Sequence, residues 1–191
     1  MELVERALDL VGERGIAALS TRALADAVGL SSGAIFRHFS TLDALLDAVV
    51  DHAVDVLSST YPDDALPAPE RLAAFVTLRA GAVGRRRGIL RLVVSEQFVR
   101  AMPPAAAARL QAAVRRTLAF VHATVSEGQV TGSFRADLPA EHLAMLVVGT
   151  VHALVILPAA SGGPALNAPA VAASILTLLS PAGNTPAPRE R

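Results

Sequence analysis

Apolar residues recur every three or four positions along most of this chain, which is the spacing of an amphipathic α-helix. Glycines and prolines interrupt the pattern and divide it into segments. The pattern predicts an all-α fold of about nine helices. Eight of them are expected over about 3–14, 32–39, 42–59, 70–84, 88–101, 104–128, 139–160 and 168–180, and a short one begins after Ser20 or Thr21 and ends at Gly29.

Residues 21–40 have the pattern of a helix–turn–helix. Ala25 is small enough for two helices to cross closely, and Gly29 suits the left-handed conformation that ends the first helix. The apolar contacts between the two helices are expected from Leu24, Val28, Leu30 and Ile35. Such a motif places its second helix in the major groove of DNA, so these residues predict a DNA-binding head.

The rest of the chain is predicted to form a separate helical body. Prolines at 62, 67 and 69 interrupt the pattern after the first four helices. We expect a helix–turn–helix DNA-binding domain over 1–45 and a helical regulatory and dimerisation domain over 46–180. The helix at about 42–59 connects the two, and residues 181–191 are expected to be a disordered tail.

Residues 6–50 resemble the N-terminal domain of the TetR family of transcriptional regulators. The resemblance rests on the helix–turn–helix and on the spacing of Phe36, His38 and Phe39, which a polar turn, Asp43 and the pair Leu45-Leu46 follow. It implies a sequence-specific regulator, most often a repressor, that binds palindromic operator DNA as a homodimer. It also implies that a small-molecule effector in the body shifts the spacing of the two heads through the connecting helix.

Three residues depart from the family pattern. Phe36 stands where the family usually has Tyr, Leu42 where a Lys is common, and Ala34 where Thr or Ser is frequent. Each change removes a polar group that would contact DNA. The residues expected to lie against DNA are Thr21, Arg22, Ser31, Ser32, Gly33, Ala34, Arg37 and His38.

Among these residues, Arg37 is the best candidate for a base contact and His38 for a phosphate contact. His38 is assigned to a phosphate because its neighbours Phe36 and Phe39 are expected to lie in the core. The alternative interpretation is ordinary helix capping and solvated charge, and it applies above all to Ser20 and Ser31.

Charge restricts the surface that can contact DNA. The formal net charge is zero, which argues against a general nucleic-acid coat protein. Residues 1–57 carry nine acidic side chains against four arginines, but within 14–40 three arginines face only Asp26. The run Arg85-Arg86-Arg87 is expected to be a solvated turn rather than a second nucleic-acid surface.

Polar residues on apolar stripes of the body are candidates for an effector site. Arg79 aligns with apolar neighbours, where a buried guanidinium needs a compensating partner. The expected ligand-binding residues are Phe75, Arg79, Phe98, Met102, Phe120, Met145 and His152. They favour a mainly apolar ligand with one acidic or polar group facing Arg79 or His152. The alternative for His152 is a core or interface histidine.

The last two helices are expected to form a four-helix bundle with those of a second copy. The expected interface residues are Leu146, Val147, Val151, Leu154, Ile175, Leu178 and Leu179. Residues 143–160 carry no formal charge and approach the length of a membrane span, but Thr150, His152 and Pro158 and the lack of basic anchors favour burial by dimerisation.

No catalytic constellation is evident. No nucleophile–base pair, metal-ligand set or phosphate loop is apparent, so neither an enzyme nor a metal or other cofactor is expected. The acidic N-terminal start argues against a signal peptide and favours a cytoplasmic protein. The sequence thus predicts a cytoplasmic, ligand-responsive DNA-binding regulator. The alternative is a dimeric DNA-binding protein whose body only dimerises and holds no effector.

Overall fold

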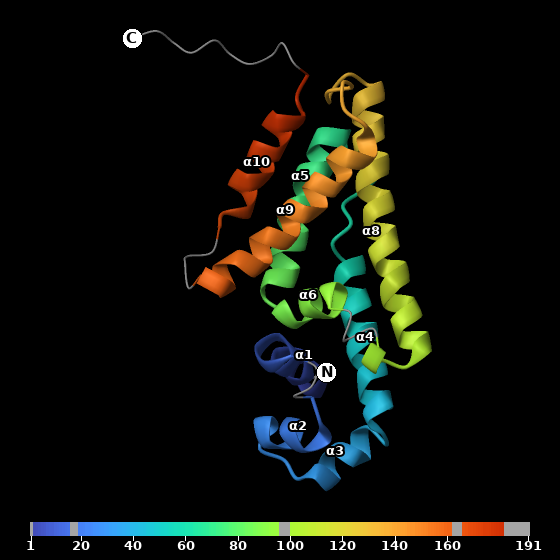
Figure 1. Ribbon diagram of the computed structural model, residues 1–191, viewed down its shortest axis with the longest axis vertical. Coiled ribbons are helices and arrows are strands. Elements are labelled where there is room, and N and C mark those ends of the chain that lie inside the picture. Colours follow the sequence, from blue (N-terminus) through green and yellow to red (C-terminus); the bar gives the residue numbers. More distant parts are fainter. Residues whose placement is uncertain (1, 16–18, 96–99, 162–165, 182–191) are drawn as a thin grey trace. The chain divides into compact units, whose positions relative to one another are not determined.

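The computed structural model describes residues 2–15, 19–95, 100–161 and 166–181, and the described residues form helices joined by turns, with no strand among them (Figure 1). The all-α prediction is therefore confirmed. The helices are α1 (Glu2–Arg14), α2 (Thr21–Val28), α3 (Ser32–His38), α4 (Leu42–Ser58), α5 (Ala68–Gly84), α6 (Arg87–Val94), α8 (Pro104–Val130), α9 (Ala140–Ser161) and α10 (Ala168–Leu179).

One predicted helix is shorter than expected. The pattern predicts a helix over 88–101, but α6 ends at Val94 and Ser95 has extended backbone angles, φ −99° and ψ 115°. Two β-branched valines followed by serine weaken the helix here, because serine offers the backbone competing hydrogen bonds. Residues 96–99 lie outside the described residues.

Side-chain caps begin the helices of the DNA-binding motif. Ser20, Ser31 and Thr41 each accept a hydrogen bond from the amide nitrogen three residues later, at 3.1, 3.2 and 3.1 Å. These caps satisfy amides that have no partner within the helix. Gly29 ends α2 with φ 69° and ψ 27°, the left-handed conformation predicted for it. The limits of α2 and α3 therefore follow from local sequence.

The chain divides into two compact units. Unit 1 consists of Met1–Tyr61 with Gly81–Arg116, and unit 2 consists of Pro62–Ala80 with Thr117–Arg191. The chain passes between the units within α5 and within α8, as well as after Tyr61. The expected division at residue 45 is thus not a boundary of packing, because residues 81–116 pack with the head.

Unit 1 is held together by a close approach of α1 and α6. A Cβ atom added at Gly88 would lie 2.0 Å from the backbone oxygen of Leu8, so only glycine fits at this crossing. The buried core of the head is formed by Ala7, Leu8, Val11, Leu24, Ile35, Leu45 and Val49, and α6 adds Ile89 and Leu92. The first helix of the head is therefore seated on a helix distant in sequence.

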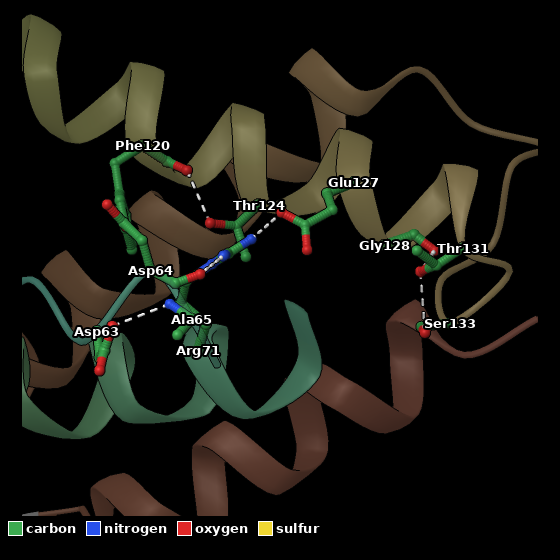
Figure 2. Close-up of polar contacts among 10 residues, drawn as sticks. All are labelled: Asp63, Asp64, Ala65, Arg71, Phe120, Thr124, Glu127, Gly128, Thr131 and Ser133. Carbon is green, nitrogen blue, oxygen red and sulfur yellow. Dashed lines mark hydrogen bonds and ion pairs between the residues drawn. The ribbon is translucent and has the colours of Figure 1, made fainter. Parts of the chain in front are cut away.

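Unit 2 packs α9 against α10, which run side by side in opposite directions (Figure 1). The Arg135 amide donates a hydrogen bond to the Leu179 carbonyl oxygen at 2.7 Å, which ties the turn before α9 to the end of α10. Figure 2 shows a part-buried polar contact in this unit, in which the Arg71 guanidinium donates to Glu127 and, at 2.6 Å, to the backbone oxygen of Asp64.

Candidate nucleic-acid interface and ligand site

The helix–turn–helix is positioned by three buried side chains. Leu24 and Ala25 of α2 are 0% and 1% exposed, and Ile35 of α3 is 0% exposed. Since Ile35 faces the core, the opposite side of α3 faces solvent. That side presents Gly33, Phe36 and Arg37, all exposed, with His38 at the end of the helix. A solvent-facing recognition helix is what contact with DNA requires.

Two residues of the motif are not buried as expected. Phe36 is 51% exposed, and Leu30 is 46% exposed. Consecutive helical residues are rotated by about 100°, so Phe36 turns away from the core when Ile35 faces it. Phe39, four residues after Ile35, returns to the same side and is half-buried. The prediction that Phe36 lies in the core was therefore wrong. Its position one residue after Ile35 already placed it on another side of the helix.

The predicted DNA-contact residues differ in their exposure to solvent. Arg22, Arg37 and His38 are exposed, whereas Thr21, Ser32 and Ala34 are partly buried. Exposed too are Gly33 and Ser31. The Ser31 hydroxyl accepts a hydrogen bond from the Ala34 amide, so the capping alternative accounts for its hydroxyl without DNA. The exposed cations thus offer the longest reach toward a phosphate or a base.

Several acidic side chains of the head are paired with arginines within unit 1. Glu5 accepts hydrogen bonds from Arg86 Nε at 2.9 and 3.0 Å, and His52 Nε2 lies 3.0 Å away from it. The Arg86 hydrogen bond is the main cause that lowers the pKa of Glu5. Arg86 is therefore ion-paired and half-buried, in contrast to the solvated turn expected for its run.

A second pairing involves α4. Arg109 Nε donates to Asp51 at 2.8 Å, and its Nη2 donates to Asp47 at 2.9 Å. These pairs are partly exposed, so each contributes little to stability. Their effect on recognition is electrostatic, because carboxylates paired with arginine repel phosphates less than free ones do.

In unit 2, Arg79 lies within a polar and aromatic cluster. Arg79 of α5 is 5% exposed, its guanidinium carbon lies 5.0 Å from the centre of the Phe75 ring, and its Nη1 donates to the Thr117 hydroxyl at 3.4 Å. The rings of Phe75 and Phe120 are 5.3 Å apart between centres. Thr117 was not among the ligand-binding residues predicted from the sequence. Its hydroxyl lies on α8, the helix that also carries Phe120.

The rest of the predicted ligand set does not join this cluster. Met145 is 67% exposed on α9, because the buried side of that helix carries Leu143, Ala144 and Val147. Met102 is buried, but it belongs to unit 1. Phe98 lies outside the described residues. Five of the seven predicted residues, Phe75, Arg79, Phe120, Met145 and His152, belong to unit 2, and Met145 is the exposed one among them.

His152 is held in its neutral form. Burial lowers the pKa of the His152 imidazole, and the positive charge of Arg79 lowers it further. A proton on His152 would be poorly solvated and would be repelled by the guanidinium. The histidine can therefore donate or accept a hydrogen bond without carrying charge at neutral pH.

This depressed pKa predicts how stability depends on pH. Below the ordinary histidine pKa of about 6.5 the unfolded chain takes up a proton that folded His152 resists, so the free energy of unfolding falls as the pH falls. Between about pH 7.5 and 5.5, the melting temperature should therefore fall less for His152→Gln than for the wild type. Exposed His142, on the same helix, provides the control His142→Gln. Parallel curves for the wild type and His152→Gln would contradict this account.

The predicted dimer-interface residues separate into two groups. Val147, Val151, Leu154, Ile175 and Leu179 are at most 8% exposed, so they pack within their own chain and leave little surface for a partner. In contrast, Leu146 and Leu178 are 66% and 72% exposed. The exposed apolar side of α9 and α10 consists of Met145, Leu146, Ile156, Leu157 and Leu178. Of the seven predicted interface residues, Leu146 and Leu178 are therefore the two with side chains open to solvent.

Helix α9 also satisfies a simple length and hydropathy criterion for a membrane span. The 18 residues Ala140–Leu157 have a mean hydropathy of 1.8, and 39% of them are buried. The core helix of a soluble protein meets the same criterion. Within the described residues, no three His, Asp or Glu side chains are grouped so that they would hold a metal ion.

Comparison with known proteins finds similarity to regulators. A family model described as "Bacterial regulatory proteins, tetR family" matches residues 3–49. The HTH-type transcriptional repressor KstR2 of Rhodococcus jostii (strain RHA1) is 27% identical over 151 residues, which are 73% of this chain and 70% of that protein. The first match covers the helix–turn–helix, and the second extends into the body.

Solved structures share the fold over nearly the whole chain. The ketosteroid transcriptional regulator KstR2 of Mycobacterium tuberculosis superimposes with a TM-score of 0.77 at 23% identity, covering 94% of this chain and 93% of that one. AibR, solved in complex with isovaleryl coenzyme A and operator DNA, superimposes with a TM-score of 0.75 at 18% identity, covering 93% and 96%. At these identities the likeness concerns the fold.

Proposed function

Because this chain belongs to the TetR family of bacterial regulatory proteins and is a DNA-binding transcriptional regulator, we propose that it acts as a homodimeric repressor that a small, mainly apolar ligand releases from operator DNA. The observation that carries the proposal is the helix–turn–helix, in which α3 is anchored by Ile35 and keeps Arg37 and His38 exposed. A regulator of this kind acts in the cytoplasm and needs no catalytic group.

Removing the exposed cation of α3 tests the DNA-binding surface. An operator is first selected from random duplexes with the purified protein. Arg37→Ala should then weaken operator binding by about tenfold or more at physiological salt, because each head loses a base or phosphate contact. Fluorescence anisotropy measures the dissociation constant, and Arg115→Ala on α8, also exposed, is the matched control. Equal affinity of Arg37→Ala and the wild type would remove Arg37 from the interface.

The proposed homodimer is supported by the exposed apolar side of α9 and α10. Five large apolar side chains of these helices have exposures of 43% to 72%, and burying them against a second copy would remove that surface from water. Dimerisation also serves recognition. One small head makes few base contacts, whereas two heads on successive turns of the major groove bind a palindrome.

A charge placed on this surface should break the dimer. Leu146→Glu should convert the protein to a monomer at micromolar concentration, because burying an unpaired carboxylate costs more than the interface gains there. Sedimentation velocity measures the mass, and operator affinity should fall along with it. Val130→Glu, at a position that is 89% exposed near the end of α8, is the control. A Leu146→Glu protein that remains dimeric would exclude this side of α9 as the interface.

The proposed effector site is the unit 2 cluster around Arg79. Phe75 and Phe120 offer apolar surface, while the Arg79 guanidinium, the Thr117 hydroxyl and neutral His152 offer polar groups for one end of a ligand. This combination suits a mainly apolar molecule that carries one acidic or polar group. The structure of the similar protein AibR contains a coenzyme A thioester, which supports testing that class first.

Release of operator DNA distinguishes this proposal from its alternative. Isovaleryl coenzyme A, straight-chain acyl coenzyme A thioesters and the free carboxylates are added to the protein–operator complex. Because coupling is reciprocal, a true effector must bind the free protein more tightly than the operator complex, by the same factor as it weakens operator binding. Titration calorimetry with and without operator measures that factor. No release by any probe would favour a dimeric DNA-binding protein without an effector of these classes.

A further inference from the structure

We propose that Phe36 contacts thymine methyl groups in the major groove, so that α3 distinguishes A·T pairs by apolar contact. This inference rests on the proposed function, since it requires an operator. It concerns a residue that is 51% exposed in the free protein. It also gives an apolar alternative to the phosphate contact that a tyrosine hydroxyl would make at this position.

The first support is the position of the ring. Phe36 is 51% exposed, although Ile35 beside it is fully buried. It lies on the outward side of α3 next to Arg37, which is also exposed. Removing a large aromatic ring from water is favourable, and this ring lies on the side on which a helix–turn–helix contacts DNA.

The second support is the charge around the ring. Arg22, Arg37 and His38 are exposed on the same motif, and within 14–40 the only acidic residue is Asp26. A partner that covers Phe36 must therefore accept positive charge around an apolar contact. A DNA duplex does so, since its phosphates flank a groove in which thymine presents a C5-methyl group.

The third support is the set of hydrogen-bonding groups that α3 lacks. The helix contains no Asn or Gln to make the bidentate contact with adenine. Gly33, Ala34 and Ile35 carry no polar side-chain atom. The Ser31 hydroxyl that precedes the helix is used as its cap. Ser32, Arg37 and His38 are the polar side chains of α3, and none of them makes the bidentate contact with adenine, so the thymine methyl is the apolar feature of an A·T pair that Phe36 can contact.

The geometry also limits where that thymine lies. Consecutive Cα atoms are about 3.8 Å apart and consecutive bases on one strand about 3.4 Å apart. The thymine that Phe36 contacts must therefore lie within about two base pairs of the base or phosphate that Arg37 contacts. Each half-site of a palindromic operator contains one such thymine.

Deoxyuridine, which is thymine without the methyl group, tests this contact. Each thymine of the selected operator is replaced by deoxyuridine, symmetrically in both half-sites, and the dissociation constant is measured by fluorescence anisotropy at fixed salt. At one position the wild type should lose about fourfold per half-site, or about 15-fold in the palindrome, which is the effect of leaving one methyl group unburied on each side.

Variants of Phe36 test the same contact from the side of the protein. Phe36→Ala should bind the thymine operator more weakly and should lose almost nothing further when that thymine becomes deoxyuridine. Phe36→Leu retains an apolar side chain and should keep part of the preference. Arg37→Ala, weaker overall, should keep the full deoxyuridine effect. Because Phe36 is largely exposed, these variants should melt within about 1 °C of the wild type, as surface substitutions usually do.

Three results would overturn the inference. One is a wild-type protein that tolerates deoxyuridine at every position, and another is a Phe36→Ala protein that shows the same deoxyuridine loss as the wild type. In either case specific operator binding would survive, and the proposed function with it. The third is a wild-type protein that selects no DNA sequence, which would overturn the proposed function as well.

Discussion

Replacing Gly88 with alanine should lower the free energy of unfolding by about 3 kcal/mol, the upper end of the usual cost of overpacking. The added Cβ would lie 2.0 Å from the Leu8 backbone oxygen and 2.8 Å from its carbonyl carbon. Backbone atoms cannot rotate aside as a side chain would, so α1 and α6 must separate. Chemical denaturation of the full chain measures the loss.

The same substitution should weaken operator binding, because α1 is part of the head and would shift relative to α6. Gly81→Ala is the matched control, since no atom lies within 4 Å of its added Cβ and the position is within α5. It should leave stability unchanged or raise it by up to about 1 kcal/mol through better helix propensity. Equal stability of Gly88→Ala and Gly81→Ala would show that α1 and α6 yield at this crossing.

Removing the carboxylate of Glu127 should destabilise the protein by about 2 kcal/mol, because it leaves a buried guanidinium without its countercharge. The Arg71 side chain is only 8% exposed, while that of Glu127 is 47% exposed. Arg71 keeps its bond to the Asp64 carbonyl, but its Nε has no hydrogen-bond partner within the described residues. Glu127→Ala is measured by thermal and chemical denaturation.

A double-mutant cycle separates burial from pairing. Arg71→Met replaces the cation by an unbranched apolar side chain and should cost less than Glu127→Ala, by about 1 kcal/mol. In the Arg71→Met background, Glu127→Ala should change the free energy of unfolding very little, since no buried charge is left without a partner. Full additivity of the two single effects would mean that the pair does not interact.

Much of the DNA-binding motif could be predicted because its signals are local. The caps at Ser20, Ser31 and Thr41 each bond to an amide only three residues away, and Gly29 ends α2 through its own backbone angles. The burial of Ile35 follows from its place in the same short motif. Family similarity over residues 3–49 confirms what this pattern indicated.

The predictions that failed depended on which side of a helix is covered. The apolar pattern of α9 continues almost around the helix, so it does not distinguish Met145, which is exposed, from Val147, which is buried. Phe36 was assigned to the core from its chemistry, whereas its angle from Ile35 turns it outward. In both cases hydrophobicity identified a helix but did not identify its neighbours.

The helices, their caps, the helix–turn–helix and the resemblance to the TetR family follow from the amino-acid sequence alone, because hydrogen bonds and helical spacing act over three or four residues. Three contacts could be learned from the folded protein alone: α1 packs against Gly88, Arg86 pairs with Glu5, and Arg79 donates to Thr117. These pairs are separated by 80, 81 and 38 positions along the chain. No periodic pattern encodes such pairs, because they form only when distant helices pack together.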